Sequence, residues 1–508
     1  MPGRIPIPER FNLARHCLEQ SAAAQPGKVA LTVVGDVAAG PGAAEYWTYG
    51  DLDRAVRGVA AGLEEAGLAP GDRLLLRLPN NSSYALLFYG AIAAGLVPIP
   101  VSSMLTERDI AFLLADSGAA GIAMDDGLVV PLAGVAAKVF DTAAIDRLRR
   151  SDPRPGYADT AAGDPAYMIY TSGTSGRPKG VVHAQRVALG RIPMHRDWQA
   201  IGGDDVMLHA GTFNWSYTLG VGLLDPWSVG AAAVLYNGPQ DIQVWPRLIR
   251  LAGATLFAAV PLLYRQMLKH AALDPADFAT IRHCLCAGEA MHPSILEQWR
   301  AATGRALYES LGMSECSTFI SSGPSVPVRP GSAGKPQQTR RIAILAVDGD
   351  DTPLPTGETG LLAIHRSDPG LMLGYWNRPE EDAATTRGDW FVGGDLAAFD
   401  DDGYVWYHGR ADDIMNAGGF RVSPLEVEAA LADCPGVAEV AVTEHRVDDT
   451  LSVIAAYVVA RPGSGIDADR VLAHAGGRLA AYKRPKQVFF VESLPRNVNG
   501  KLQRRALG

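Results

Sequence analysis

The feature that most constrains the fold is an alternation of helix-length amphipathic segments with short apolar runs. Two such runs, residues 73–78 and Gly121–Met124, are bounded by glycine and proline turns. This pattern is typical of a parallel sheet whose strands are connected by helices. The chain of 508 residues is long enough for about three structural units with a sizeable core. We therefore expect an α/β fold built on parallel sheets.

Two changes in the residue pattern divide the remainder of the chain. From about residue 331 to about residue 410 the sequence breaks into short strand-like runs separated by glycine and proline, which predicts a small β-barrel-like unit. A polar turn follows and is suited to a domain boundary. We therefore expect a large N-terminal domain over residues 1–411, with α/β subdomains to about residue 330, and a small mobile α+β C-terminal domain over residues 412–508.

The expected C-terminal domain opens with signals for the start of a helix. Ser423 is placed to be an N-cap, Pro424 suits a first turn, and Glu426 completes a capping box. Strands are expected near residues 437–443 and 452–459, with helices between and after them. The polar, glycine-bearing C-terminal stretch predicts an exposed tail unless something binds it.

Composition excludes several classes of protein. Hydrophobic residues make up 47% of the chain and charged residues 20%, which argues against intrinsic disorder and against a membrane-embedded protein. The most lipid-like run, residues 84–101, is interrupted by glycine and proline, so it predicts a buried helix followed by a turn. The formal net charge of −9 offers no global positive field for nucleic acid or anionic lipid.

The cysteines bear on the cellular compartment. They number five, an odd count that cannot form a complete set of intramolecular disulfides. Cys284 and Cys286 flank a single residue, and no second Cys/His pair follows at zinc-finger spacing, so we expect two buried small side chains. Prolines interrupt the N-terminus where a signal peptide needs an apolar stretch. These features favour a reducing, cytoplasmic location.

The most informative stretch is YTSGTSGRPKG at residues 170–180. Its three glycines let backbone N–H groups approach an anion, its five Ser, Thr and Tyr hydroxyls add donors, and Lys179 adds positive charge. A Walker-type P-loop needs Ser or Thr after its Gly-Lys pair, whereas Gly180 and Val181 follow Lys179 here. The sequence therefore predicts a phosphate-binding loop of another kind.

This stretch resembles the phosphate loop of the adenylate-forming superfamily, which includes acyl- and aryl-CoA synthetases, carrier-protein-loading adenylation domains and luciferases. Three further motifs match in order: ESLGMSE at residues 309–315, GDLAAFDDDGYVWYHGR at 394–410 and PRNVNGK at 495–501. The resemblance covers essentially the whole chain, with a weaker signal over the first 160 residues. It implies ATP and CoA as substrates and Mg²⁺ as the metal.

The resemblance also implies roles for individual residues. Lys179 and the loop hydroxyls would hold the β- and γ-phosphates, Glu315 would coordinate Mg²⁺, and Glu309 would contact the adenine amino group. Asp395 would accept hydrogen bonds from both ribose hydroxyls. Leu311 stands where many relatives place an aromatic that stacks on adenine. The implied ATP- and AMP-binding residues are Thr171, Ser172, Gly173, Thr174, Lys179, Gly288, Glu289, Ala290, Glu309, Ser310, Leu311, Gly312, Met313, Ser314, Asp395 and Arg410.

The implied catalytic residues lie mostly in the C-terminal part of the chain. Lys501 would place an ammonium between the carboxylate and the α-phosphate, where negative charge accumulates as the carboxylate attacks. Arg421 would add a second positive contact, and Glu315 acts through the metal. By the resemblance, the C-terminal domain then rotates about Asp412 and presents Gly418 and Gly419 to the pantetheine of CoA.

The acyl pocket is expected in the aromatic-rich segment after a predicted strand. The resemblance assigns to it Phe213, Asn214, Trp215, Tyr217 and Gly312. Acetate-specific relatives place a tryptophan at the position of Gly312, and a glycine leaves space, which favours an acid larger than acetate. Trp215 resembles acetyl- and medium-chain synthetases, whereas Leu311 occurs among aryl-CoA ligases. Both an aromatic and a medium-chain acid therefore stay open.

The function that these motifs predict is an ATP-dependent carboxylate–CoA ligase. An alternative is a stand-alone adenylation enzyme that loads a carrier protein, and another is a nucleotide-binding regulator with a dead active site. The expected partners are a small carboxylic acid, ATP and CoA, without nucleic acid or membrane insertion, in a monomer or homodimer. PRNVNGK also fits a pattern that lysine acyltransferases modify in some relatives, so acylation of Lys501 is a further expectation.

Overall fold

The computed structural model of the protein describes residues 5–130, 137–172, 178–239, 241–413, 415–417, 420–447, 452–496 and 501–507. Contacts divide the chain into two compact units. Unit 1 consists of Met1–Arg341 and His365–Thr386, and unit 2 consists of Ile342–Ile364 and Arg387–Gly508. The segment His365–Thr386, which the sequence assigns to the β-rich unit, thus groups with unit 1. The boundary at residue 412 stays a prediction.

Unit 1 is organised around a nine-stranded sheet. Six neighbouring strands, from β13 to β1, run parallel, and the strands at both ends are antiparallel. This confirms the expected α/β fold. In sheet order the strands are β15 (Lys335–Pro336), β14 (Ser317–Ser321), β13 (Leu307–Met313), β12 (His283–Ala287), β11 (Leu256–Ala259), β9 (Val206–His209), β10 (Ala232–Tyr236), β1 (Val29–Val34) and β2 (Glu45–Thr48).

Helices cover both faces of this sheet. On one face α9 (Val244–Ala252), α10 (Pro261–His270) and α11 (Pro293–Thr303) form a hydrophobic cluster with the strands. On the other face α6 (Val187–Met194) and two π-helical turns, η3 (His195–Gln199) and η4 (Gly220–Leu224), pack on the sheet. All four residues of β11 and all five of β12 are buried. Because these strands are covered on both faces, they need apolar residues along nearly their whole length.

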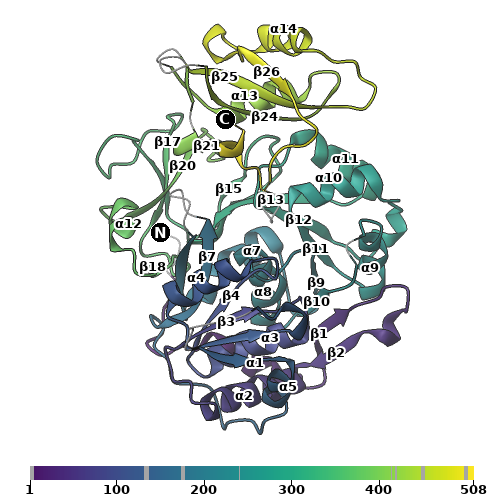
Figure 1. Ribbon diagram of the computed structural model, residues 1–508, viewed down its shortest axis with the longest axis vertical. Coiled ribbons are helices and arrows are strands. Elements are labelled where there is room, and N and C mark those ends of the chain that lie inside the picture. Colours follow the sequence, from purple (N-terminus) through teal and green to yellow (C-terminus); the bar gives the residue numbers. More distant parts are fainter. Residues whose placement is uncertain are drawn as a thin grey trace. The chain divides into compact units, whose positions relative to one another are not determined.

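A second, four-stranded parallel sheet lies in the N-terminal part of unit 1 (Figure 1). It contains β4 (Val97–Pro100), β3 (Arg73–Arg77), β5 (Gly121–Met124) and β6 (Lys138–Phe140), with α4 (Glu107–Ser117) and α5 (Thr142–Arg149). The core cluster between the two sheets contains α1 (Leu13–Ala24), α2 (Tyr49–Glu65) and α3 (Ser82–Ala93).

Helix α3 explains the most lipid-like run of the sequence. Every one of its 12 residues is buried, so apolar side chains are needed all round the helix. The chain then turns through Gly95, whose φ of 78° suits glycine, and continues into β4. The predicted buried helix and turn are confirmed. Among the described residues, no helix is long and apolar enough to cross a membrane.

A three-stranded sheet joins the middle of unit 1 to the segment His365–Thr386. Its strands are β7 (Pro165–Ser172), β8 (Pro178–Ala184) and β18 (Gly374–Tyr375), and β18 pairs with β8. The helix α12 (Pro379–Ala384) follows. Asp116 anchors this segment, since it accepts from Arg378 at 2.6 Å and from the Tyr170 hydroxyl at 2.7 Å. The remaining short helices of unit 1 are α7 (Ser216–Leu219) and α8 (Asp225–Ser228).

Unit 2 contains a five-stranded sheet and a small α+β region. The five-stranded sheet has the order β16-β17-β20-β19, with β21 paired to β20. Helices α13 and α14 pack on the three-stranded sheet formed by β24, β25 and β26. The elements are β16 (Ile342–Leu345), β17 (Gly360–His365), β19 (Thr386–Arg387), β20 (Trp390–Phe399), β21 (Val405–Arg410), β22 (Met415–Ala417), β23 (Phe420–Val422), α13 (Pro424–Ala432), β24 (Val437–Arg446), β25 (Ser452–Ala460), α14 (Ala468–Arg478) and β26 (Gln487–Phe490).

The predicted helix after Ser423 is confirmed, but the capping box is wrong. Ser423 is the N-cap of α13, yet its side chain makes no capping bond and instead donates to the carbonyl of His408 at 2.6 Å. Glu426 forms an ion pair with Lys483. A neighbouring strand thus offers the hydroxyl a better acceptor than the local helix offers donors. The predicted strands near residues 437–443 and 452–459 are confirmed as β24 and β25.

Surface and cysteines agree with the compositional expectations. All five cysteines lie within the described residues, and each is free and buried. Cys284 and Cys286 are fully buried in β12 as expected.

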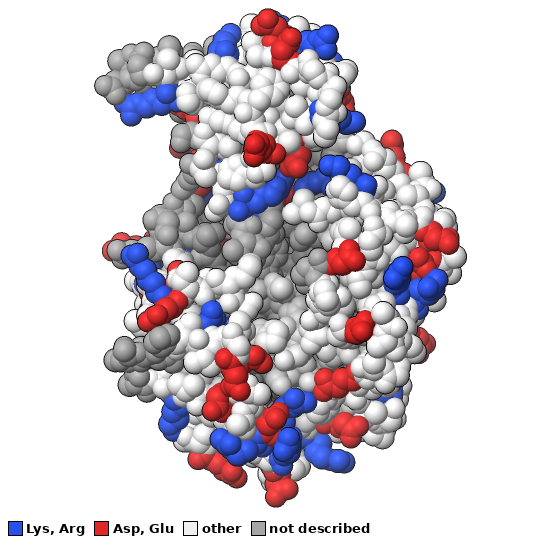
Figure 2. All heavy atoms as spheres, turned by 45° about the vertical axis from the view of Figure 1, so that its right-hand side comes forward, with Lys and Arg blue, Asp and Glu red and all other residues white. Residues whose placement is uncertain are grey.

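Over the part of unit 1 at the bottom of Figure 2, acidic and basic side chains are intermingled. That region therefore presents a field of mixed sign.

The core beneath α11 provides a test of the packing. Trp299 has no exposed surface and meets Tyr264 and Phe278 edge-on at ring-centroid distances of 4.7 and 5.6 Å. We predict that Trp299→Ala lowers the free energy of unfolding by about 3–5 kcal/mol, because the buried ring leaves a cavity. Met104 is 63% exposed, so Met104→Ala is the control and costs less than about 0.5 kcal/mol. Urea unfolding followed by circular dichroism measures both, and equal losses would contradict this packing.

Candidate active site

A β-hairpin carries the predicted phosphate loop. Strands β7 and β8 are antiparallel, and their register places Thr171 opposite Lys179. Gly173 and Thr174 lie outside the described residues, and only the backbone of Ser172 is described. The hairpin therefore holds the two described ends of the loop, Thr171 and Lys179, side by side.

The structure brings Lys179 and Glu315 together through Tyr375. The Lys179 ammonium lies 4.0 Å from the centre of the Tyr375 ring, and the Tyr375 hydroxyl donates to Glu315 Oε1 at 2.7 Å. Lys179 also pairs with Glu381 at 2.8 Å. Burial, followed by the charge of Glu315, raises the pKa of Tyr375, so its hydroxyl stays protonated and donates. One aromatic residue thus connects the phosphate-loop lysine to the predicted metal ligand.

The turn that bears Glu315 is held in an uncommon backbone conformation. It connects β13 to β14, and Ser317 adopts a left-handed φ of 65°. Three contacts fix this turn: His183 Nε2 lies 2.8 Å from the carbonyl oxygen of Ser314, Met372 donates to the carbonyl of Glu315 at 2.7 Å, and Arg191 donates to the Ser317 hydroxyl. Glu315 therefore projects from a turn that is anchored on both sides.

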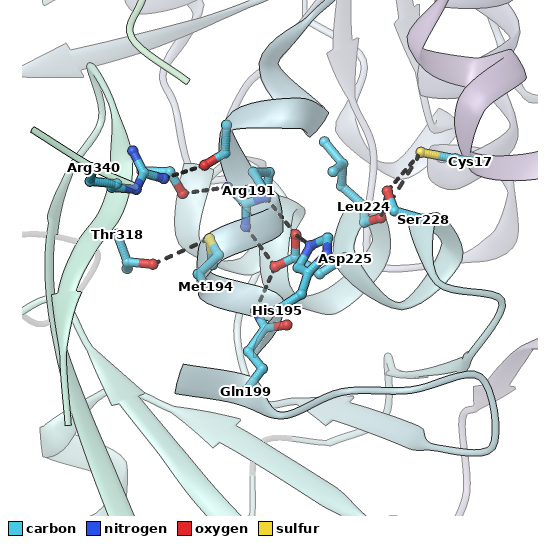
Figure 3. A network of polar contacts seen from close by, with 12 residues as sticks. Cys17, Arg191, Met194, His195, Gln199, Leu224, Asp225, Ser228, Thr318 and Arg340 are labelled. Carbon is cyan, nitrogen blue, oxygen red and sulfur yellow. Dashed lines mark hydrogen bonds and ion pairs between the residues drawn. The ribbon is translucent and has the colours of Figure 1, made fainter. Parts of the chain in front are cut away.

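Behind this turn lies a buried ionic network centred on Asp225 (Figure 3). Asp225 accepts from Arg191 Nε at 2.5 Å and Nη2 at 2.7 Å, and from Gln199 at 2.6 Å, and His195 Nε2 lies 2.8 Å from Oδ1. The side chains of Arg191 and Asp225 are 2% and 0% exposed. Burial alone would raise the pKa of Asp225, but Arg191 and His195 outweigh it and hold that pKa below its usual range.

A second buried arginine lies beside the network. Arg340 pairs with Asp368 at 2.9 Å, with side chains 1% and 5% exposed, and it donates to the backbone carbonyl of Gly190 in α6. Its guanidinium also reaches Cys316, next to Glu315, at 3.3 Å from the sulfur. Two arginine–aspartate pairs therefore tie α6 to the turn and to the segment that carries Tyr375.

The predicted purine contacts lie at the carboxyl edge of the nine-stranded sheet. Gly288 follows β12 with φ of 106°, a conformation that favours glycine, and turns the chain into Glu289 and Ala290. Glu309 on the neighbouring β13 accepts a hydrogen bond from the Met291 backbone at 3.1 Å. Burial raises the pKa of Glu309 from 4.5 to about 8, so its carboxyl is largely protonated at neutral pH. Such a group can both donate and accept.

The rest of ESLGMSE divides between surface and structure. Ser310 is buried, and its hydroxyl donates to the carbonyl of Ile320 at 2.7 Å, so it supports the strand pair. Leu311 and Met313 are half-buried, which leaves part of each side chain accessible. The pairing of β13 with β14 shifts register between Leu311 and Gly312.

Gly312 has a further reason for being glycine, besides the space that the sequence indicates. A Cβ there would lie 2.6 Å from the carbonyl oxygen of Ser317 and 2.7 Å from Cα of Thr318. The glycine is needed because the backbone of β14 passes close to it at the register shift. The space that glycine leaves for the acid stays a prediction beside this structural reason.

The predicted acyl-pocket segment begins directly after β9. Asn80 holds its first turn, because it donates to the carbonyl of Gly211 at 2.6 Å and accepts from the backbone of Phe213 at 3.2 Å. The Phe213 side chain is 1% exposed and packs on Tyr84, so it belongs to the core. Asn214, Trp215 and Tyr217 are each half-buried.

In unit 2 the predicted ribose-binding pair lies on adjacent strands. Asp395 in β20 is directly opposite Arg410 in β21, and the closest approach of their charged groups is 3.7 Å. Asp395 is 7% exposed and accepts from the Tyr407 hydroxyl at 3.1 Å. Arg410 also reaches Asp412 at 3.0 Å. Burial lowers the pKa of Arg410, but Asp395 and Asp412 outweigh it and raise that pKa.

Lys501 lies at the start of a docked C-terminal segment, not in the exposed tail that the sequence predicts. A β-bridge joins Leu502 to Arg496, and the side chains of Leu502 and Leu507 pack on a hydrophobic cluster. Arg504 pairs with Glu428 at 2.6 Å. Lys501 itself is exposed. The polar composition of this segment predicts exposure, but its two leucines anchor it to the hydrophobic cluster.

The remaining predicted residues of unit 2 are only partly described. Gly418 and Gly419 lie outside the described residues. Arg421 is described in its backbone alone, where it pairs with Asn416 between β22 and β23. Asp412 lies in a short 3₁₀ turn after β21. This position is consistent with a connection between sheets.

Tyr375, Arg191 and Asp225 are site residues that the sequence did not reveal. Tyr375 is 60 residues from Glu315, and Arg191 is 34 from Asp225. No local spacing rule connects such pairs. The one available signal was a single arginine and a single aspartate in otherwise apolar segments, because buried charges occur in pairs.

Comparison with known proteins identifies the family. Residues 18–376 match the family described as AMP-binding enzyme, and residues 426–501 match its C-terminal domain. The chain therefore belongs to the AMP-binding enzyme family, as the four motifs predict.

Individual relatives extend over nearly the whole chain. Benzoate–CoA ligase of Thauera aromatica is 33% identical over 99% of this chain and 97% of that protein. The human mitochondrial acyl-coenzyme A synthetase ACSM5 is 32% identical over 99% of this chain and 91% of that protein. The crystal structure of ATP-bound MatB from Rhodopseudomonas palustris superimposes with a TM-score of 0.89 at 27% identity, covering 98% of each chain. The architecture is thus that of an AMP-forming ligase.

The raised pKa of Glu309 predicts a pH-dependent stability. In the unfolded chain Glu309 ionises near its ordinary pKa, whereas in the folded protein it holds its proton to about pH 8. The folded state therefore binds more protons between these values, and its stability falls as the pH rises through that window. Glu309→Gln lacks this loss, so its unfolding midpoint relative to the parent rises from about pH 5 to about pH 8 and then levels off. Parallel midpoints in urea unfolding across this range would contradict the assignment.

The ion pair Arg191–Asp225 predicts a strong mutual dependence. We expect Asp225→Ala to lower the free energy of unfolding by about 3–5 kcal/mol, because it leaves a buried guanidinium without its counter-charge. Arg191→Met is similarly costly, and the double variant loses clearly less than the sum of the two. The control is Asp146→Ala in the half-exposed pair with Arg149, which costs less than about 1 kcal/mol. Additive losses would refute the coupling.

Proposed function

We propose that this protein is an ATP-dependent carboxylate–CoA ligase. It joins a carboxylic acid to ATP, forming an acyl-adenylate and pyrophosphate, and then transfers the acyl group to CoA, releasing AMP. The observation that carries this proposal is the contact of one residue, Tyr375, with both Lys179 and Glu315. The named activities of the acyl-coenzyme A synthetase and benzoate–CoA ligase relatives support it. They do not favour the carrier-protein alternative.

The phosphate end of ATP is assigned to Lys179, Thr171, Ser172, Gly173 and Thr174. Lys179 pairs with Glu381, and a phosphate oxygen would compete for the same ammonium. The β7–β8 hairpin fixes the point from which this loop departs, which reduces the ordering needed when the phosphates bind. Lys179 then neutralises charge on the departing pyrophosphate.

Glu315 fits the implied Mg²⁺. It offers a carboxylate, the ligand type that Mg²⁺ prefers, and the Tyr375 hydroxyl orients one of its oxygens. Among the described residues, no group of three or more His, Cys, Asp or Glu side chains is placed to hold a metal ion. A Mg²⁺ bound chiefly through substrate phosphates matches such a site. When held beside Glu315, the metal would supply positive charge that offsets the negative charge of the phosphates.

Each unit contains residues that we assign to the adenosine end of ATP. In unit 1 the Gly288-Glu289-Ala290 turn, Glu309, Ser310, Leu311, Gly312, Met313 and Ser314 provide the purine and α-phosphate side. The protonated carboxyl of Glu309 is suited to the adenine edge, which presents both donors and acceptors. In unit 2 Asp395, oriented by Tyr407, accepts hydrogen bonds from the ribose hydroxyls, and Arg410 lies beside that carboxylate.

Chemistry at the carboxyl group depends on Lys501. The acid's oxygen attacks the α-phosphorus, the bond to pyrophosphate breaks, and the ammonium stabilises the charge that develops between them. Arg421 adds a second positive charge. Rotation about Asp412 then brings Gly418 and Gly419 to the thiol, which attacks the acyl carbonyl and releases AMP. The docking of the C-terminal segment supports this role, because a fixed backbone makes the position of the ammonium reproducible.

Other properties follow from the same proposal. The acid is larger than acetate, aromatic or medium-chain, and it binds beside Asn214, Trp215 and Tyr217.

The exposure of Lys501 supports access by a lysine acyltransferase, which would remove the charge that adenylation needs. Five free cysteines support a reducing compartment such as the cytoplasm. The oligomeric state is a monomer or homodimer.

Acid-dependent AMP release, with and without CoA, tests the proposed function directly. The panel comprises acetate, hexanoate, benzoate and phenylacetate. We expect release that requires both an acid larger than acetate and CoA. Exchange of pyrophosphate into ATP without thioester formation would support the carrier-protein alternative instead, and silence across the panel would contradict a ligase.

The role of Lys501 predicts a loss confined to one half-reaction. We expect Lys501→Ala to slow adenylate formation at least about a hundredfold, because a preorganised charge is lost, while ATP binding and thioester formation from supplied acyl-adenylate persist. Lys486 is likewise exposed in unit 2, and Lys486→Ala is the matched control with unchanged rates. Equal losses in both half-reactions would contradict the assignment.

A further inference from the structure

A buried histidine without hydrogen-bond partners ends strand β9. His209 is 5% exposed, and among the described residues neither Nδ1 nor Nε2 has a partner. Buried polar groups are nearly always satisfied, because an unsatisfied one costs about 1–3 kcal/mol. Burial lowers the pKa of His209 to about 3, so the ring is neutral at physiological pH. It therefore carries one unused donor and one unused acceptor.

The position of His209 is where open parallel sheets bind ligands. It is the last residue of β9, whose neighbours β10 and β11 are parallel to it, so it lies at their carboxyl edge. Residues two apart in a strand share a face, and Met207 packs in the cluster that also contains Ala258, Leu285 and Tyr217. His209 therefore belongs to the sheet face on which the proposed acyl-pocket residue Tyr217 lies.

The immediate surroundings of the imidazole confirm this placement. The ring meets Tyr217 edge-on at a centroid distance of 4.4 Å. A Cβ at Gly211 would come within 3.1 Å of both Nδ1 and Cε1, and one at Gly222 within 3.1 Å of the His209 Cβ. Glycine at both positions keeps side chains away from the ring. The Thr218 hydroxyl also lies beside Gly211, but among the described residues no group hydrogen-bonds to either ring nitrogen of His209.

A second unsatisfied group lies in the same segment. The indole N–H of Trp215 is buried and, within the described part of the chain, has no acceptor. The Tyr217 hydroxyl makes two long hydrogen bonds within the described residues, at 3.4 Å to the carbonyls of Ala259 and Leu285. An acyl pocket for a purely apolar acid would have no use for such groups, since a leucine or phenylalanine would cost less. A polar substrate group explains why they are kept.

We propose that His209 is a specificity-determining residue of the acyl pocket, and that the preferred acid carries a hydroxyl or amino substituent that hydrogen-bonds to its imidazole. This inference rests on the proposed ligase function. The imidazole accepts from the substituent through one nitrogen and donates to it through the other, according to its tautomer. An acid with a methyl group in the same place fills the space but leaves the ring unsatisfied.

The test compares matched acids in the full-length enzyme. The probes are ortho-, meta- and para-hydroxybenzoate and aminobenzoate, each against the methylbenzoate of the same geometry, with benzoate, and a hydroxyhexanoate against hexanoate. The readout is kcat/KM for CoA-dependent AMP release. We expect at least one polar acid to exceed its apolar counterpart by about tenfold or more, because only that acid satisfies the buried ring.

Variants of His209 distinguish specificity from structure. We expect His209→Leu to reduce the ratio of kcat/KM for the polar acid to kcat/KM for its apolar counterpart by about tenfold or more, and this ratio is read within the variant itself. His209→Asn, which keeps a donor and an acceptor, retains part of the preference. The matched control for stability is His283→Leu: His283 is also buried, but its Nε2 lies 2.8 Å from the carbonyl of Gln199. That variant loses stability, whereas His209→Leu does not.

Each outcome bears on one of the two proposals. No AMP release with any acid overturns the ligase function and this inference with it. Release without preference for any polar acid overturns this inference alone. A preference that survives in both His209 variants places the polar contact on another residue and also overturns it. If His209→Leu fails to fold, the parent panel and His209→Asn still decide.

Discussion

The ion pair between Arg191 and Asp225 is the constraint on which the site of unit 1 depends. The carboxylate of Asp225 is 0% exposed, so protein groups must replace the hydrogen bonds that water would make to it. Arg191, Gln199 and His195 provide these contacts. These donors fix α6, the π-helical turn and α8 with respect to one another. Because Arg191 also donates to Ser317, the same pair holds the turn that presents Glu315. Arg340 repeats the principle on the other side of α6.

Each unit contributes preorganised charge by its own means. In unit 1 an aromatic ring lies between a lysine and a glutamate: Lys179 and Glu315 both contact Tyr375, and Glu381 holds the ammonium of Lys179 in place. In unit 2 a strand register places Arg410 opposite Asp395, and two leucines anchor the segment that begins with Lys501. Electrostatic catalysis requires charges that are fixed before the reaction begins. In both units, side-chain packing and strand pairing fix the positions of these charges.

Local signals in the sequence identified the elements, and motifs identified the candidate chemistry. Gly121–Met124 was bounded correctly because a short apolar run between turns has few other uses, and residues 84–101 indicated a buried helix because no polar face was present. The capping role of Ser423 failed because a carbonyl from β21 competes for its hydroxyl, and sequence contains no information on that approach. The close approach of β14 to Gly312 could not be predicted for a similar reason: it is set by strand pairing, which only the folded chain reveals. The links from Tyr375 to Glu315 and from Arg191 to Asp225 join distant positions and were inaccessible for the same cause.

The arrangement of unit 1 separates two kinds of residue along the chain. The groups proposed to face the acid follow β9, between His209 and Tyr217, whereas those proposed to face the nucleotide follow β12 and lie in β13. Among the described residues, no hydrogen bond joins a side chain of the first group to the Asp225 network or to the β7–β8 hairpin. A substitution in the first group therefore takes no hydrogen bond from the turn that presents Glu315. The fold thus allows the residues proposed for the acid and those proposed for the nucleotide to be altered separately.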